Sequence, residues 1–242
     1  MGSQGEVTQV VVHQPALPLG TLHGAWLVAA KDLRIEARSR AGLHQVLPFG
    51  GIVLVLFALA LDPDRGLLAR VSPGLFWLAV LLCSLLAVSR SVAVEAGQAT
   101  RDALRLSALS GASIFLGKVG AASVTLLALT LVLGTGTVLL YDVTVRGLAV
   151  LIVASLPAVV GLAAAGILYG ALCSGVRSGE ALLPILLLPA VTPVLLGATK
   201  AFEVAVAGVP GEAWSWVELL LAFAVAYLAG GTAAFGALLE DA

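Results

Sequence analysis

The chain has 242 residues, of which 60% are hydrophobic and only 11% are charged, whereas soluble proteins carry about a quarter charged residues. Its apolar residues form long runs that can cross a hydrocarbon core of about 30 Å, so the composition indicates an integral membrane protein rather than a soluble enzyme. The 13 Lys and Arg against 14 Asp and Glu give a net charge of −1, which provides no basic field for nucleic acid.

The N-terminal part is more polar than the rest of the chain. Residues 1–22 contain Pro15 and Pro18 and lack a helical period, which predicts a mobile N-terminal arm without a signal peptide. In residues 23–44, apolar side chains recur at helical spacing between charges. This pattern predicts an amphipathic helix that lies in the membrane interface rather than crossing it.

The remaining sequence, residues 45–242, predicts a six-helix transmembrane domain and therefore an all-α fold. The predicted spans cover approximately residues 45–61, 71–88, 119–140, 148–172, 181–199 and 217–239. The fifth span contains Pro184, Pro189 and Pro193. Each proline removes a backbone hydrogen bond and clashes with the preceding turn, so this helix is predicted to be bent or broken.

Lys and Arg are distributed unequally between the two sides of such a six-span protein. One side holds nine, Lys31, Arg34, Arg38, Arg40, Arg90, Arg101, Arg105, Lys118 and Arg177, and the other holds four, Arg65, Arg70, Arg146 and Lys200. Because positive residues are retained on the cytoplasmic face, both termini are predicted to be cytoplasmic.

The sequence offers little for catalysis, metal binding or ion coupling. It has no GxSxG, HExxH or phosphate-binding loop motif. His13, His23 and His44 lack a nearby second ligand, and Cys83 and Cys173 fall in or at the end of apolar runs, so no metal site is expected. The cores of the six spans contain no charged residue or His, which argues against a proton-coupled or sodium-coupled transporter. The energy for any transport would then come from a partner.

The most informative soluble segment follows the second span, from Ser89 to Lys118. A connection this long is usually functional or disordered, and residues 100–109 can form a short amphipathic helix. One hypothesis is a coupling helix that sits in a groove of a cytoplasmic ATPase. The alternative, equally open, is an interfacial helix that rests on lipid headgroups. The candidate contact residues of this segment are Arg90, Glu95, Arg101, Asp102, Leu104 and Arg105.

The arrangement resembles the heme exporter protein B family, the permease subunit of the ABC transporter of cytochrome c maturation. The resemblance covers the chain from about Trp26 to the end. It is carried by residues 31–36 (KDLRIE), 73–77 (PGLFW), 82–87 (LCSLLA) and 182–193 (LLPILLLPAVTP), of which the last block is the most specific. The chain departs from the family pattern at Ser89, where an acid is expected, at Ala93, where a base is common, and at Ala108, where proline is expected.

The resemblance implies an ABC-2-like permease of six helices with an interfacial first helix and no nucleotide site of its own. It implies partners: a cytoplasmic ABC ATPase that uses ATP, a haem-handling membrane subunit, a small helper subunit, and two permease copies or a pseudo-dimer in the lipids of the inner membrane. Haem is the implied substrate, exported or released on a loaded chaperone. The alternatives are an ABC permease for another hydrophobic substrate and a membrane scaffold that transports nothing.

Overall fold

The computed structural model describes residues 20–39, 41–61, 65–95, 109–174 and 179–241, and these residues are almost entirely helical. The helices are α1 (Thr21–Ser39), α2 (Ala41–Leu61), α3 (Arg65–Glu95), α5 (Gly111–Tyr141), α6 (Leu148–Ser174), α7 (Gly179–Ala207) and α8 (Trp214–Asp241), with the 3₁₀ turn η1 (Pro210–Ala213) before α8. No strand occurs in these ranges. The predicted all-α fold is confirmed.

Six of these helices have the composition of membrane helices. Five, α3, α5, α6, α7 and α8, are long and apolar enough to cross a membrane, and α2 contributes a shorter apolar stretch, Gln45–Leu61. At 1.5 Å of rise per residue, the 17 residues of this stretch extend over about 26 Å, the lower end of the length that crosses a hydrocarbon layer of about 30 Å. The chain is therefore a multi-pass membrane protein with about six spans.

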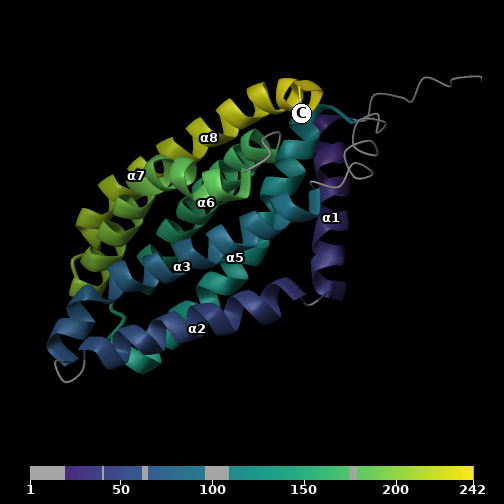
Figure 1. The fold of residues 1–242 in the computed structure, drawn as a ribbon. Helices are drawn as coiled ribbons and strands as arrows, with labels where there is room; N and C mark the ends of the chain where they lie inside the picture. Colours follow the sequence, from purple (N-terminus) through teal and green to yellow (C-terminus); the bar gives the residue numbers. More distant parts are fainter. Residues whose placement is uncertain (1–19, 40, 62–64, 96–108, 175–178, 242) are drawn as a thin grey trace, which may run out of the picture.

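The six helices run alternately up and down, so their ends gather at two ends of an elongated bundle (Figure 1). The α1 end contains the starts of α2, α5 and α7 and the finishes of α3, α6 and α8. The far end contains the α2–α3, α5–α6 and α7–α8 connections. Helix α1 lies at the first of these ends and runs across the direction of the others, packed mainly against α5.

Helix α6 lies at the centre of the bundle and packs against α3, α5, α7 and α8. Its segment from Gly161 to Gly166 consists of glycine, alanine and one leucine, and every residue in it is buried. Small side chains let neighbouring helix backbones approach closely, which is the main source of helix association in lipid. An added Cβ at Gly166 would lie 2.8 Å from a methyl group of Val88 on α3, so this contact tolerates no larger residue.

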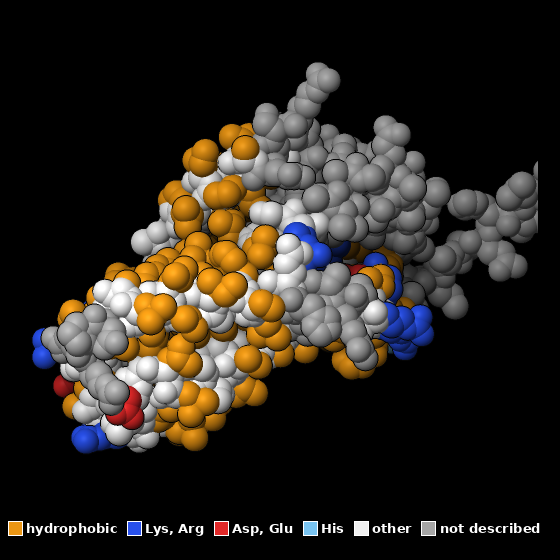
Figure 2. Space-filling model, turned by 60° about the horizontal axis from the view of Figure 1, so that its bottom comes forward, with side chains coloured by type: hydrophobic (Ala, Val, Ile, Leu, Met, Phe, Trp, Pro, Cys, Tyr) orange, Lys and Arg blue, Asp and Glu red, His pale blue; other side chains and the backbone are white. Residues whose placement is uncertain are grey.

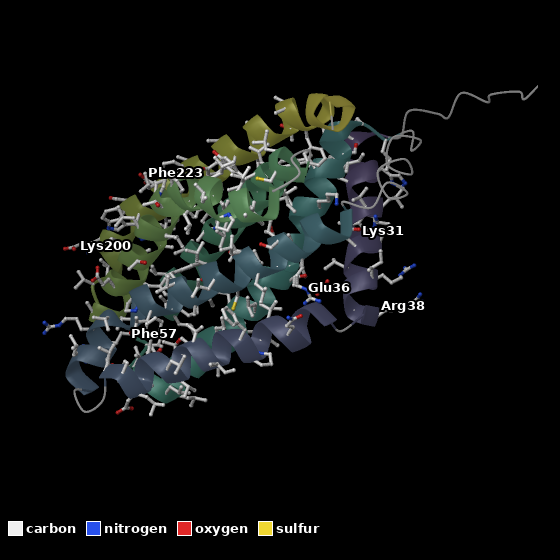
Figure 3. The ribbon with its side chains drawn as sticks, in the orientation of Figure 1. Lys31, Glu36, Arg38, Phe57, Lys200 and Phe223 are labelled. Atoms are coloured by element: carbon white, nitrogen blue, oxygen red, sulfur yellow. The ribbon has the colours of Figure 1, made fainter. Side chains whose placement is uncertain are left out.

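Charges flank an apolar middle. Figure 2 shows a broad band of hydrophobic side chains with charged groups toward its ends, and Figure 3 places Lys31 and Arg38 at the α1 end and Lys200 at the far end. No charged side chain among the described residues is buried. This distribution is the one that a surrounding bilayer requires, because a charge in the hydrocarbon layer is costly.

The helices extend beyond several predicted bounds. Helix α1 ends at Ser39 and α2 begins at Ala41, whereas the predicted boundary lay at residue 44. Helix α3 continues to Glu95 and α5 begins at Gly111, so the predicted loop of residues 89–118 is largely helical at both ends. A helix remains favourable beyond the apolar layer as long as its backbone bonds continue. The predicted arm of residues 1–22 lies almost wholly outside the described residues.

Candidate functional site

The predicted coupling segment is bracketed by α3 and α5 at the α1 end. Arg90 lies on the last turns of α3 and is half-buried, and Glu95 is the final residue of that helix. The other predicted contact residues, Arg101, Asp102, Leu104 and Arg105, lie outside the described residues. What the structure adds is the position of the two helices to which this segment is joined.

Helix α5 begins at a fixed point. The Ser110 hydroxyl oxygen accepts a hydrogen bond of 3.2 Å from the backbone N–H of Ser113, and the two serine hydroxyls lie 2.8 Å apart. Such an N-cap satisfies a donor that the helix start leaves free and stabilises the helix by about 1 kcal/mol. The connection from α3 therefore enters α5 at a defined residue.

The first turns of α5 are in close contact with α1 on one side. An added Cβ at Gly117 would lie 2.6 Å from the carbonyl oxygen of Ala25 and 2.6 Å from Cβ of Val28, and one at Gly24 would lie 3.1 Å from Cβ of Ser113. The two backbones can approach this closely only because glycine lacks a side chain. Movement of α5 at this end must therefore move α1.

Helix α8 holds the other side of the same turns. An added Cβ at Gly111 would overlap the backbone of Gly236, and one at Gly231 would overlap the ring of Phe115. Phe115 is fully buried and also contacts the Phe235 ring, with the ring centroids 5.4 Å apart. The start of α5 is thus closely packed against α1 on one side and α8 on the other.

Helix α7 runs without interruption through Pro184, Pro189 and Pro193. It is not broken, and its predicted bend remains a prediction. Tyr227 of α8 donates a hydrogen bond of 2.6 Å to the carbonyl oxygen of Ala190, three residues before Pro193. In an α-helix Pro193 leaves the carbonyl of residue 189 without its usual donor, so the Tyr227 bond falls on the next carbonyl of the same turn and attaches α8 to α7 there.

Two similar bonds attach α2, which packs mainly against α3 and α5. Tyr141 at the end of α5 donates a hydrogen bond of 3.0 Å to the carbonyl oxygen of Leu54. The Cys83 thiol of α3 donates one of 3.6 Å to the carbonyl oxygen of Val46. Cys83 and Cys173 are both buried and free. Cys83 therefore has a packing and bonding role between helices.

An apolar groove opens at the far end between α3, α5, α6 and α7, with a volume of about 430 Å³. Phe76 and Phe202 form part of its wall, with their rings stacked at 5.3 Å. The Trp77 ring contacts both of them edge-on at 5.3 Å, and its Nε1 has no hydrogen-bond partner among the described residues. Sequence reasoning did not find this groove, because its lining comes from four helices and carries no motif.

Within the described parts of the chain, no group of three or more His, Cys, Asp or Glu side chains could hold a metal ion. The described residues also offer no assembled nucleophile and base. The sites that remain are mechanical or apolar: the wedged start of α5 beside the predicted coupling segment, and the groove at the opposite end.

Residues 23–241 match the family described as CcmB protein. The chain belongs to the CcmB family. It is 32% identical over 201 residues to Heme exporter protein B of Pseudomonas aeruginosa, a match that covers 82% of this chain and 90% of that protein. It is 33% identical over 228 residues to Heme exporter protein B of Escherichia coli strain K12, covering 85% of this chain and 90% of that one. These findings confirm the family resemblance read from the sequence.

Proposed function

We propose that this CcmB-family chain is the membrane permease subunit of an ATP-driven ABC transporter for cytochrome c maturation. The observation that carries the proposal is the family match, which runs from residue 23 to residue 241 and so includes the helices from α1 to α8. The name of the relatives points to haem as the exported substrate. Release of a haem-loaded chaperone from a neighbouring subunit is a second form of the same proposal.

The energy is proposed to come from a cytoplasmic ABC ATPase. The described helices bury no charged side chain that could relay ions through the bundle, and the sequence has no ATP-binding motif of its own. Contact with the ATPase is assigned to Arg90, Glu95, Arg101, Asp102, Leu104 and Arg105. In support, this segment joins the last turn of α3 to the first turn of α5 at the α1 end, where α5 is in close contact with both α1 and α8.

The remaining subunits of the proposed complex are a haem-handling membrane protein and a small helper subunit, with two permease copies or a pseudo-dimer. The α1 end is proposed to face the cytoplasm across the inner membrane, with both termini on that side. Described Lys and Arg support this orientation, since Lys31, Arg34, Arg38, Arg90 and Lys118 lie at the α1 end and Arg70, Arg146 and Lys200 at the far end.

Helix α1 is proposed to lie in the interface rather than to cross the membrane. Leu22 and Trp26 are 80% and 70% exposed, and Lys31, Arg34 and Arg38 are exposed on a neighbouring face. A helix with one apolar and one cationic face sits at the headgroup boundary. Its course across the end of the bundle fits that position (Figure 1).

Copurification tests the ATPase proposal. Cells would coexpress this chain with a cytoplasmic ABC ATPase from the same genome, and the capture of ATPase would be compared between wild type, Asp102→Arg, Leu104→Arg and Glu212→Arg. Glu212 is exposed in η1 at the far end, so it gives a matched charge reversal away from the proposed contact. We expect wild type and Glu212→Arg to capture ATPase and the other two to lose it. Failure of the wild type to capture any ATPase would refute the proposal.

Haem dependence is tested separately in the assembled complex. If the ATPase is captured but its turnover is indifferent to haem and to the haem chaperone, the chain is a permease for another hydrophobic substrate.

Orientation is tested by labelling with a membrane-impermeant maleimide. In a chain carrying Cys83→Ala and Cys173→Ala, we expect Gly211→Cys to be labelled from outside intact spheroplasts and Arg38→Cys only after lysis. Both positions are exposed at opposite ends of the bundle. The reverse pattern would invert the topology and place the coupling segment on the wrong side for an ATPase.

A further inference from the structure

The proposed export function gives no role to the apolar groove at the far end of the bundle. Its α5 wall extends from Leu127 to Leu139, a rise of about 18 Å over twelve steps of 1.5 Å each. The volume of about 430 Å³ lies within the range of small-molecule sites, about 300–1,000 Å³. The groove is therefore long and narrow, and it runs from the α5–α6 connection toward the middle of the bundle.

The groove opens sideways toward lipid. On its rim, Leu131 and Leu139 of α5 are 73% and 75% exposed, and Ile152 and Leu156 of α6 are also exposed. These are large apolar side chains on the outer surface of membrane-crossing helices. Molecules that reach the groove through this opening come from the hydrocarbon layer.

The lining accepts hydrocarbon and offers nothing to a polar guest. The hydroxyls of Ser72, Thr130, Thr137 and Ser155 each donate to a backbone carbonyl of their own helix, at 2.6 to 2.9 Å. No His, Cys, Met, Tyr or charged residue lines the groove in the described structure. Haem iron is held by an axial His, Cys, Met or Tyr ligand, so this groove is not built to ligate it.

Two arginines lie close in the sequence to residues that line the groove at its far-end limit. Arg146 lies next to the lining residue Val145, Arg70 lies two residues before Ser72, and both arginines are exposed. Arginine binds phosphate oxygens through charge-assisted hydrogen bonds. An apolar channel with cations at its outer limit complements a molecule with a phosphate head and a hydrocarbon chain.

We propose that the groove between α3, α5, α6 and α7 binds one acyl chain of a membrane glycerophospholipid, whose phosphate is held by Arg70 and Arg146. The chain enters between α5 and α6 and lies against the stacked Phe76–Phe202 pair. The site lies against both α5 and α6 near the connection that joins them. A conformational change that brings α5 and α6 closer together expels the acyl chain from the groove. The proposal is independent of the nature of the exported substrate.

The test uses Trp77 as a reporter, since its ring contacts the two phenylalanines of the wall. The variants Trp26→Phe, Trp214→Phe and Trp216→Phe leave Trp77 as the only tryptophan. The protein is reconstituted in phosphatidylcholine vesicles with or without bromine on the acyl chains, because bromine quenches indole fluorescence at short range. Trp77 is 1% exposed, so strong quenching requires a brominated chain inside the groove.

Two leucine substitutions separate groove binding from general lipid contact. An added Cβ at Gly134 would lie 3.6 Å from the Phe76 ring, an ordinary contact, so Gly134→Leu fills the groove, whereas Gly230 of α8 has open space around it. We expect bromine-dependent quenching in the parent and in Gly230→Leu, and loss of most of it in Gly134→Leu. Ser155→Leu on the α6 wall provides a second filled groove should Gly134→Leu fail to fold.

The phosphate contact is tested with brominated lipids added as a minor component of plain vesicles. Brominated phosphatidylcholine should quench Trp77 more strongly than brominated diacylglycerol, and Arg70→Gln with Arg146→Gln should remove the difference. Equal quenching of the parent and both glycine variants overturns the proposal. Quenching that appears only when copies of the chain are diluted apart also overturns it and assigns the groove to a second copy. Hemin-dependent quenching that Gly134→Leu abolishes, without any bromine effect, assigns it to a tetrapyrrole.

Discussion

The substitution Gly231→Ala tests the close contact between α8 and the start of α5. The added Cβ would overlap the Phe115 ring, and that ring is fully buried and packed on Phe235. Overpacking of this kind costs about 1–3 kcal/mol. The gain in helix propensity on replacing glycine with alanine returns about 1 kcal/mol, so the net change is a destabilisation of about 0–2 kcal/mol.

The neighbouring Gly230→Ala is the matched control, because no atom lies within 4 Å of its added Cβ. It keeps the propensity gain of about 1 kcal/mol without the overlap. The two variants should therefore differ by about 1–3 kcal/mol in the free energy of unfolding. At about 2–4 °C per kcal/mol for a chain of this size, Gly231→Ala should unfold several degrees below Gly230→Ala.

The assay is thermal unfolding of the purified protein in detergent, followed by size-exclusion chromatography of the folded fraction. Phe115→Leu removes the clashing ring atoms, so combining it with Gly231→Ala should show a favourable coupling energy of about 1 kcal/mol in a double-mutant cycle. Equal midpoints for Gly231→Ala and Gly230→Ala, together with zero coupling, would refute a tight α5–α8 contact.

Three further substitutions test individual helix contacts. Tyr227→Phe should lose the hydrogen bond to the Ala190 carbonyl and destabilise the protein by about 0.6–1.7 kcal/mol, measured as a lower unfolding midpoint than that of the wild type. An unchanged midpoint would show that this bond does not stabilise the α7–α8 contact. Tyr141→Phe should cost a similar amount, about 1 kcal/mol, and should increase the proteolysis of α2, whereas unchanged cleavage would argue against that attachment. Gly117→Ala should weaken the contact between α5 and α1, since its Cβ would lie 2.6 Å from the Ala25 carbonyl oxygen. Amide exchange in α1 should then rise about tenfold for each 1.4 kcal/mol of stability lost. The control is Gly120→Ala, whose Cβ would make only an ordinary 3.8 Å contact, and equal exchange in the two variants would refute a tight α1–α5 contact.

The fold could be predicted because the solvent determines it. In lipid only helices and closed barrels satisfy every backbone group, and the span predicted at residues 148–172 ends two residues before α6, Leu148–Ser174, does. The starts of helices in polar sequence were less predictable. Ser110 caps α5, but residues 111–118 were predicted to belong to the polar connection, and the third span was predicted to begin only after Lys118.

The contacts that make the bundle specific were out of reach of the sequence. Gly231 is identifiable as a small residue, but nothing near it in the chain points to Phe115, which lies on another helix. The groove is still less visible, because Phe76 and Phe202 come from α3 and α7 and each resembles any other apolar residue of a span. Local patterns report which face of a helix is apolar, whereas pairing between helices depends on shapes that only the assembled bundle defines.

Helix α5 connects the two regions for which a role is proposed. Its first turns are in close contact with α1 and α8 through Gly117, Gly111 and Phe115, while its other half lines an open groove from Leu127 to Leu139. Closely packed contacts transmit displacement, because packed interfaces resist gradual deformation, and a cavity is where displacement can be taken up. A push on the segment before Ser110 would therefore move α1 and α8 with α5 at one end and change the α5–α6 spacing at the other.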